Sequence, residues 1–296
     1  MKLLIAIDSS SASQLVLEEA AVRPWPAGTA FSIVTAVDEK RFAELPALID
    51  DAKREGERIV KAGVERLARA GQVAGSQVIL GHPRRAVSAY AAEWGADLIL
   101  VGSRGHGTIG RFLLGSVAQG ILRTASGSVE IVRFPSGEPA PSSHPMKVLL
   151  ATDGSDCSLV AANSVAARPW PEGTVFRVLS VEELVSVDAP MAGSSLSAIY
   201  PASLLDELLT CARARAVDAV EAARKVLLQA VKNVLNKQSI PIGDPRSVIL
   251  DSAQAWSADL IVLGSHGWRG VDRLLMGSVA ESVAVHAHCS VEVIRK

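Results

Sequence analysis

The sequence predicts two tandem α/β domains, each a doubly wound open parallel sheet with helices on both faces and the strand order 3-2-1-4-5. Three observations lead to this fold class. The chain has 296 residues, which suits two domains of ordinary size better than one. It contains an internal repeat, in which Arg23-Pro24-Trp25-Pro26 returns as Arg168-Pro169-Trp170-Pro171. In both copies short β-branched runs alternate with longer helical patterns, which is typical of parallel strands joined by right-handed helical crossovers.

The first copy contains five short apolar runs separated by four longer segments. Runs rich in Val, Ile and Leu between turn residues are typical of strands that are buried on both faces of a parallel sheet. The longer segments have apolar residues at helical spacing. The expected strands are Leu3–Ile7, Phe31–Val37, Ser76–Leu80, Leu98–Val101 and Val129–Val132, and the expected helices are Ser13–Val22, Ile49–Ala70, Arg84–Trp94 and Ser116–Thr124.

The second copy repeats this order, from a first strand at Val148–Ala151 to a last strand at Val291–Ile294. Its expected third strand contains Pro241. Proline cannot donate a ladder hydrogen bond, so it is tolerated at the edge of a sheet rather than at its centre. The third strand is therefore expected at an edge, which agrees with the order 3-2-1-4-5.

The repeat divides the chain into residues 1–134 as the first domain, residues 135–145 as a Pro- and Ser-rich linker, and residues 146–296 as the second domain. The last strands of the two copies, Val129–Val132 and Val291–Ile294, alternate between apolar and acidic residues at a predicted sheet edge. We expect them to pair across an intrachain pseudo-twofold axis, because such pairing covers both edges.

The second copy is longer than the first. The offset between equivalent residues is 145 at Asp8 and Asp153 but 162 at Gly81 and Gly243, so the second copy has 17 additional residues. The insertion is placed near residues 184–205, after the second strand. It is expected to form a lid over the second of two sites.

Composition and charge exclude several classes of protein. With 49% hydrophobic and 21% charged residues the chain is globular, and its formal charge of −1 provides no field that would attract nucleic acid or an anionic membrane. No run approaches the roughly 18–20 apolar residues of a membrane span. The three cysteines are scattered, so neither a disulfide framework nor a zinc site is expected. We therefore expect a cytoplasmic protein that binds neither nucleic acid nor membranes.

One spacing, G-x2-G-x9-G-S, occurs in each copy at the end of the fourth strand and runs to the start of a helix. This is the usual ligand crevice of open α/β sheets. Glycines there permit positive φ and a close approach of the backbone to a ligand, and the free amides of the first helical turn suit a phosphate oxygen. Neither GxxxxGK[ST] nor a GxGxxG after the first strand is present. The recurrence of one spacing with different filler residues favours a nucleotide site over a plain turn.

These features resemble tandem universal stress proteins over nearly the full length of the chain. The resemblance rests on Asp8 and Asp153 at the first strands, on Gly-x-Pro at Gly81 and Gly243, and on the two Gly-Ser-x-Gly-x9-Gly-Ser-Val loops. Similar proteins with this loop bind ATP, so the resemblance implies an ATP-binding stress-response regulatory protein with two sites for ATP, ADP or AMP. The implied site residues are Asp8, Ala36, Gly102, Gly105, Gly115, Ser116 and Val117 in the first copy, and Asp153, Ser180, Gly264, Gly267, Gly277, Ser278 and Val279 in the second.

Several of these residues have two open interpretations. Asp8 and Asp153 either contact the ribose or a Mg²⁺ ion, or cap the helix that follows. Arg111 and Arg273, at equivalent positions in the nine-residue spacers, either pair with phosphate or lie on the surface. The tryptophans of the Arg-Pro-Trp-Pro repeat are expected to cover the core rather than to stack on a base.

No nucleophile–base set occurs at matched positions in the two copies, and HExxH and GxSxG are absent. We therefore expect no catalytic residues and at most slow ATP hydrolysis. Two alternatives stay open: an ATP-dependent adenylyl- or phosphoryl-transfer enzyme, and a structural interaction module with vestigial loops. The expected partners are the nucleotide and a protein that the sequence does not identify. A homodimer beyond the intrachain pseudo-dimer is also left open.

Overall fold

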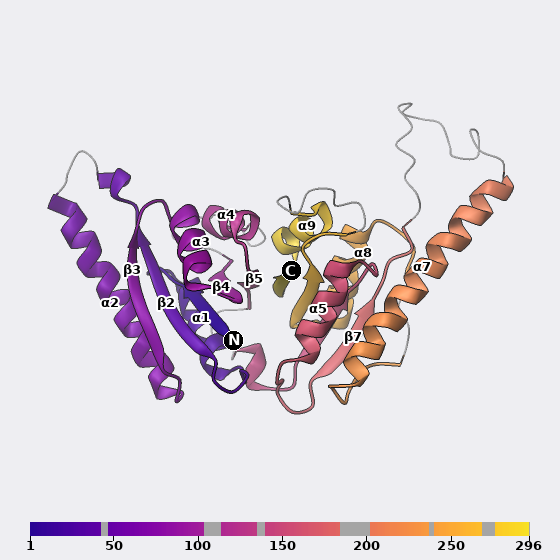
Figure 1. Cartoon of the computed structure of the whole chain (residues 1–296), viewed down its shortest axis with the longest axis horizontal. Coiled ribbons are helices and arrows are strands. Elements are labelled where there is room, and N and C mark those ends of the chain that lie inside the picture. The colour runs from indigo at the N-terminus through magenta and orange to yellow at the C-terminus, as the bar shows by residue number, and fades with distance from the viewer. Residues whose placement is uncertain are drawn as a thin grey trace.

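In the computed structural model, the two halves of the chain form one continuous nine-stranded sheet with helices on both faces (Figure 1). The structure describes residues 1–42, 47–103, 114–134, 140–183, 202–236, 240–267 and 276–295, with the side chains of 202–205 left aside. The strand order is β3-β2-β1-β4-β5-β9-β8-β6-β7. The neighbouring strands are parallel, except that β5 and β9 run antiparallel where the halves meet.

The first half confirms the predicted fold class and strand order, and its elements begin and end within two residues of the expected positions. The strands are β1 (Lys2–Ala6), β2 (Ala30–Val37), β3 (Ala74–Leu80), β4 (Leu98–Gly102) and β5 (Ser128–Val132). The helices are α1 (Ser11–Val22), α2 (Ala47–Arg69), α3 (Pro83–Trp94) and α4 (Ser116–Thr124), with a short 3-10 helix η1 (Glu39–Phe42) before α2.

The second half repeats this arrangement with one strand fewer in its described part. The strands are β6 (Lys147–Ala151), β7 (Val175–Leu179), β8 (Leu260–Gly264) and β9 (Ser290–Ile294). The helices are α5 (Asp156–Ala166), α7 (Ala202–Leu228), α8 (Pro245–Trp256) and α9 (Ser278–His286). Helix α7 lies on the outer flank of the second half, as α2 does on the first (Figure 1).

The prediction of a third strand around Pro241 in the second half is wrong for the described residues. In the described residues two isolated parallel bridges take its place, Phe176 with Val234 and Glu182 with Ile242. The Pro241 carbonyl accepts a hydrogen bond from the Glu182 amide at 2.9 Å, so this segment does lie at the sheet edge. Proline can accept but not donate in a ladder, which limits the pairing to short pieces.

The sheet separates three buried apolar cores. In β1, Leu3 and Ile5 pack under α1 and α2, while Leu4 packs under α3 and α4, because successive side chains of a strand point to opposite faces. The core under α1 and α2 belongs to the first half, and the core under α5 and α7 belongs to the second. The core under α3, α4, α8 and α9 is continuous across both halves. The halves therefore share one core on the face that carries α4 and α9.

The predicted pairing of the last strands is confirmed. Strands β5 and β9 form an antiparallel ladder in which Val129 lies opposite Val293 and Glu130 lies opposite Glu292. This pairing removes the edge that each half would otherwise expose. It also makes the chain an intrachain pseudo-dimer, whose two sheets meet at the middle of the molecule (Figure 1).

An arginine after each of these last strands reaches into the opposite half. Arg133 donates to the carbonyls of Ala287 and Ala284 at the end of α9. Arg295 donates through Nη2 to the Leu122 carbonyl near the end of α4, at 2.6 Å. Cations interact favourably with the carbonyl end of a helix. Each half therefore caps the last helix of the other.

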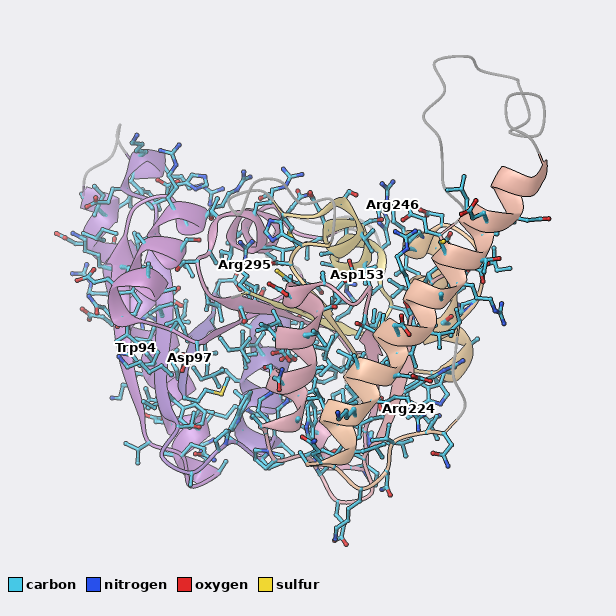
Figure 2. The ribbon with its side chains drawn as sticks, turned by 45° about the vertical axis from the view of Figure 1, so that its right-hand side comes forward. Trp94, Asp97, Asp153, Arg224, Arg246 and Arg295 are labelled. Carbon is cyan, nitrogen blue, oxygen red and sulfur yellow. The ribbon has the colours of Figure 1, made fainter. Side chains whose placement is uncertain are left out.

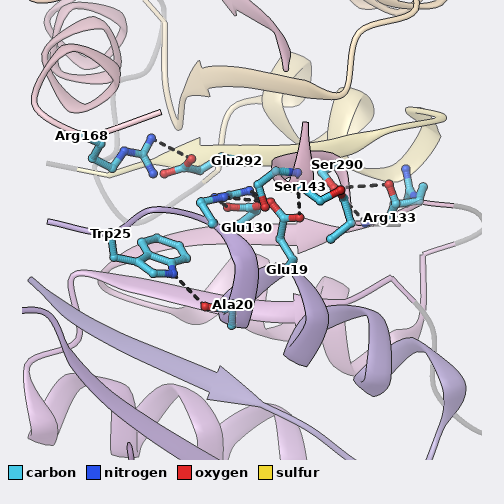
Figure 3. A network of polar contacts seen from close by, with 12 residues as sticks. Glu19, Ala20, Trp25, Glu130, Arg133, Ser143, Arg168, Ser290 and Glu292 are labelled. Carbon is cyan, nitrogen blue, oxygen red and sulfur yellow. Dashed lines mark hydrogen bonds and ion pairs between the residues drawn. The ribbon is translucent and has the colours of Figure 1, made fainter. Parts of the chain in front are cut away.

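Two glutamates face each other in this ladder and are buried, with Glu130 0% and Glu292 1% exposed (Figure 3). Like charges directly opposite each other destabilise a sheet, so each needs a cation. Arg23, at the end of α1, donates to both carboxylate oxygens of Glu130 at 2.6 and 2.7 Å and also to Glu19. Arg168, at the end of α5, donates to Glu292 at 2.9 Å.

The electrostatics of the two sides of this network differ. Burial raises the pKa of Glu292, Arg168 lowers it only in part, and the charge of Glu130 raises it further. Burial lowers the pKa of Arg23, but the attraction of Glu130 and Glu19 outweighs burial and raises that pKa overall. In the first half the network therefore stabilises the charged form of Arg23. In the second half burial disfavours the ionised form of Glu292.

The tryptophans of the repeat cover the core, as predicted. The Trp25 indole donates to the Ala20 carbonyl at 2.9 Å, and the Trp170 indole donates to the Val165 carbonyl at 2.8 Å. Each ring also packs edge-on against a phenylalanine of the strand that follows, with centroids 6.3 and 5.5 Å apart. The repeat thus fixes the turn between a helix and the next strand and places Arg23 and Arg168 in the buried network.

Candidate functional site

A pocket of about 420 Å³ opens in the second half at the carboxyl edge of the sheet, where β6 and β8 end and α9 begins. Its volume lies within the range of roughly 300–1,000 Å³ that is typical of small-molecule sites. Figure 2 shows Asp153 and Arg246 at this end of the second half, and both residues line the pocket. All seven residues predicted for the second site line it too: Asp153, Ser180, Gly264, Gly267, Gly277, Ser278 and Val279.

The first glycine of each spacing makes room for a helix. A Cβ on Gly264 would lie 2.7 Å from the backbone carbonyl carbon of Cys157 in α5, and one on Gly102 would lie 2.9 Å from the Ala12 Cβ in α1. Real Cβ atoms essentially never approach so closely, so these glycines let the first helix of each half pack on the end of the fourth strand. The expectation that glycine serves ligand approach therefore misses a packing role at these two positions.

The last glycine of each spacing is the N-cap of a helix. Gly115 and Gly277 have φ of −62° and −64°, so the positive φ that glycine permits is not used at these two positions. Their amides donate to the carbonyls of Ser103 and Ser265, both at 2.8 Å, which ties the helix start to the strand end.

The N-cap glycines leave the first helical turn without a side-chain cap. The amides of the first three helical residues have no acceptor within the helix, and the positive end of the helix dipole lies among them. In α9 these residues are Ser278, Val279 and Ala280, all of which line the pocket. This is an arrangement that suits an anion.

Asp8 and Asp153 contact the start of the following helix. The Asp153 carboxylate accepts from the amide and hydroxyl of Ser155, at 3.0 and 2.6 Å, and Asp8 accepts in the same way from Ser10. Ser10 and Ser155, not the aspartates, are the N-caps. The other oxygen of Asp153 lies beside the glycine-serine loop of the second half, because a Cβ on Gly267 would lie 2.5 Å from it. The contact with the helix start is thus present, and a contact of the carboxylate with a ligand stays a prediction.

The strand-two positions differ between the halves. Ser180 is buried just after β7 and lines the pocket, next to Val181. Ala36 is half-buried in β2, opposite Ile79 of β3. Apolar residues also line the pocket, among them Val181, Ala212 and Ile249, together with the charged side chains of Glu183 and Arg215.

Part of the first site lies outside the described residues. Gly105, His106 and Arg111 belong to residues 104–113, and Arg273 belongs to residues 268–275. The insertion expected to form a lid also lies outside the description, except for the start of α7. Of the first site the structure places Asp8, Ala36, Gly102, Gly115, Ser116 and Val117, on β1, β2, β4 and α4 and the residues that adjoin them.

Sequence reasoning missed several residues of the pocket wall. Arg246 follows the Gly-x-Pro of the second copy, and its Nη2 lies 3.2 Å from the Ser278 hydroxyl. The signal for it was available, because the first copy has Arg84 at the equivalent position. Arg215 and Ala212 come from α7. No motif in the sequence of that helix predicts that these residues line the pocket.

His266 also lines the pocket, and burial, together with the charge of Arg295, lowers its pKa. Its Nδ1 lies 2.9 Å from the Ser265 hydroxyl. Its Nε2 is buried and has no hydrogen-bond partner in the described part of the chain. A serine–histidine pair needs a third group to orient the base, and that group is missing among the described residues.

No group of three or more His, Cys, Asp or Glu side chains is placed to hold a metal ion within the described ranges. None of the helices described here combines the length and the apolar character that crossing a bilayer requires.

Comparison with known proteins assigns the chain to a family. The model of the universal stress protein family matches residues 1–133 and 145–295. A universal stress protein of Methanocaldococcus jannaschii is 34% identical over 152 residues, which are 51% of this chain and 82% of that protein. One of Mycolicibacterium smegmatis is 32% identical over 206 residues, 69% of this chain but only 63% of that relative. A crystal structure of a universal stress protein from Archaeoglobus fulgidus has the same fold, with a TM-score of 0.65, 20% identity and coverage of 100% of this chain and 96% of its own. The chain therefore belongs to the universal stress protein family, with one match to the family in each half.

Proposed function

We propose that this chain is an ATP-binding stress-response regulatory protein with two nucleotide sites, one in each half, and at most slow ATP hydrolysis. One observation carries the proposal. The residues selected by the glycine-serine spacing and by the ends of strands one and two surround a single pocket of about 420 Å³ in the second half. The residues that line this pocket provide one end that suits phosphates and another end that suits a base.

The two ends of the pocket suit the two ends of a nucleotide. The unpaired amides at the start of α9 suit phosphate oxygens. The apolar wall at Val181, Ala212 and Ile249 suits the face of a purine, and the buried Ser180 hydroxyl can hydrogen-bond to its edge.

The pocket also fits a magnesium ion that is shared with phosphates. Mg²⁺ is commonly bound through one or two carboxylates together with substrate phosphates rather than by an all-protein cage. Asp153 provides one carboxylate at the pocket wall, and one of its oxygens is already held by Ser155. Asp8 is the equivalent group in the first half.

A regulatory role is favoured over phosphoryl or adenylyl transfer. Ser265 and His266 form the one serine–histidine contact of the described pocket wall. The buried Nε2 of His266 has no hydrogen-bond partner there that could orient the ring. Position 104 of the first copy is Arg104, so the pair is not repeated. We propose cytoplasmic binding modules at residues 1–134 and 146–296, joined by residues 135–145.

The test is to measure nucleotide on the purified chain. Mass spectrometry of the nucleotide retained through purification identifies it, and titration with ATP gives the stoichiometry. We expect two nucleotides per chain and at most slow hydrolysis. Sustained turnover of several per second would instead favour a transfer enzyme. Absence of binding at millimolar nucleotide would favour the structural module.

Variants test the placement of the phosphates. A side chain on Gly277 would meet the Ser265 carbonyl at 3.0 Å and displace the helix start. The double variant Gly115→Val/Gly277→Val should lose binding at both sites. Gly75→Val in the edge strand β3 is the matched control, because the nearest atom to a Cβ there is 3.9 Å away. Full binding by the double variant would contradict this placement.

A further inference from the structure

A second repeated motif lies beside the phosphate loop. Gly-x-Pro-Arg occurs at residues 81–84 and again at residues 243–246. In each half the proline is the first residue of a helix, α3 or α8, and the arginine is the second. Both arginine side chains are exposed.

In the second half the arginine reaches the start of α9. Arg246 Nη2 lies 3.2 Å from the hydroxyl oxygen of Ser278, the first residue of that helix. Both residues line the pocket, and Figure 2 labels Arg246 at this end of the second half. Its guanidinium group therefore lies next to the amides proposed to hold a phosphate.

The position of this arginine is unfavourable for a cation. Arg246 occupies the first turn of α8 and contacts the first residue of α9, so it lies near the positive ends of two helix dipoles. Asp244, the N-cap of α8, forms no ion pair with Arg246 in the described chain, and its carboxylate accepts from the amide and hydroxyl of Ser247. An anion between the two helices would relieve this accumulation of positive charge.

In the first half the equivalent arginine contacts the corresponding helix at a different place. The Cγ and Cβ atoms of Arg84 lie 2.6 and 2.9 Å from the position that a Cβ on Gly120 would occupy. Gly120 lies in the second turn of α4, so the stem of Arg84 crosses the helix whose start belongs to the first site. The equivalent residue in α9 is Ser282, yet both halves bring the arginine to the helix of the phosphate loop.

We propose that Arg84 and Arg246 bind the terminal phosphates of the nucleotide and thereby set a preference for ATP and ADP over AMP. This inference rests on the proposed function. Ser180 and Val181 follow β7 at the sheet edge, whereas Arg246 contacts the first residue of α9, the helix that follows β8, which lies two strands away. From that side its guanidinium group meets the terminal phosphates, which AMP lacks. A planar guanidinium group suits a phosphate, because it can donate two parallel hydrogen bonds.

The test compares the affinity for ATP, ADP and AMP in the full chain with Mg²⁺, by calorimetry. In the double variant Arg84→Gln/Arg246→Gln we expect about a tenfold weaker ATP affinity and a change of less than about threefold for AMP, as for the loss of one charge-assisted contact. Arg85→Gln is the matched control, since it removes an exposed arginine one residue along α3. Arg84→Lys/Arg246→Lys should recover part of the ATP affinity.

The outcomes separate the two claims. The inference is supported if the ratio of the AMP to the ATP dissociation constant falls toward one in the double glutamine variant and stays unchanged in Arg85→Gln. An unchanged ratio in the double variant, with unaltered circular dichroism, refutes the inference and leaves the proposed function standing. Absence of binding in the unmodified chain refutes the proposed function and the inference with it.

Discussion

Replacement of Arg23 by methionine tests the buried charge network at the middle of the sheet. The Arg23 side chain is 2% exposed and donates four hydrogen bonds to Glu19 and Glu130, at 2.6 to 2.8 Å. Methionine keeps much of the volume but leaves two buried carboxylates without a cation. Removal of one partner of a buried pair costs about 3–5 kcal/mol, and we expect a loss of stability in that range at pH 7.

The equivalent change on the other side should cost less. Arg168 makes one hydrogen bond to Glu292 and one, at 3.1 Å, to the Ser164 carbonyl, because serine stands where the first half has Glu19. Its Nη1 has no partner among the described residues. Arg168→Met also leaves a carboxyl whose pKa is already raised and which can take up a proton. We expect a cost at or below the lower end of the range for Arg23.

The assay is urea unfolding of the full chain, followed by circular dichroism at pH 7 and at pH 5. The exposed pair Arg66–Glu18 provides the control, since Arg66→Met should cost less than about 1 kcal/mol. The penalty of Arg23→Met should shrink at pH 5, where the orphaned carboxylates protonate more readily. A penalty below about 1 kcal/mol, or one that grows at pH 5, would contradict the inference that Arg23 neutralises Glu19 and Glu130.

Three further predictions concern single residues. The pKa of Glu292 in the folded chain lies above its ordinary value of 4.5. Its contribution to the free energy of unfolding is therefore fully present below about pH 4.5 and is lost as the pH rises through the raised pKa. The parent chain should therefore gain stability relative to Glu292→Gln as the pH falls from 7 to 5, and a gap that moves the other way in urea titrations would contradict this. Burial raises the pKa of Cys289 to about 12, whereas Cys211 is exposed, so a thiol reagent should label Cys211 in the native state and Cys289 only after unfolding. Mass spectrometry of the labelled peptides decides, and early labelling of Cys289 would count against its burial. Finally, Gly264→Ala would place a Cβ 2.7 Å from the Cys157 backbone. We expect this variant to lose about 1–3 kcal/mol of stability in thermal unfolding. An unchanged melting temperature would exclude the close approach of α5 to the end of β8.

The fold was predictable because its signals are local or repeated. Apolar runs between turn residues locate the buried strands, and Ser116–Thr124 begins and ends as expected because a glycine N-cap precedes it. The alternation of valine and glutamate in Val129–Val132 and Val291–Ile294 predicted a half-polar edge, and this led to the correct pairing of β5 with β9.

The features that the sequence did not predict depend on contacts between distant residues. Arg23 and Glu130 are 107 residues apart, so nothing local shows that one neutralises the other. The segment around Pro241 was expected as an edge strand because a proline is tolerated there, but the missing donor of that proline limits its pairing to isolated bridges. The glycine spacing does not include Arg246, although the same arginine recurs after Gly-x-Pro in the first copy.

The exchange of arginine caps between the halves has a consequence for how the chain can be divided. A single half made alone would lack the cap for its own last helix and would expose the edge of its last strand. Because the contact surface is nearly self-complementary, such a fragment should associate with a second copy of itself. In the natural chain the linker holds the partner at a high effective concentration. The tandem arrangement thus makes formation of the central ladder independent of protein concentration, which a protein built from separate subunits cannot achieve.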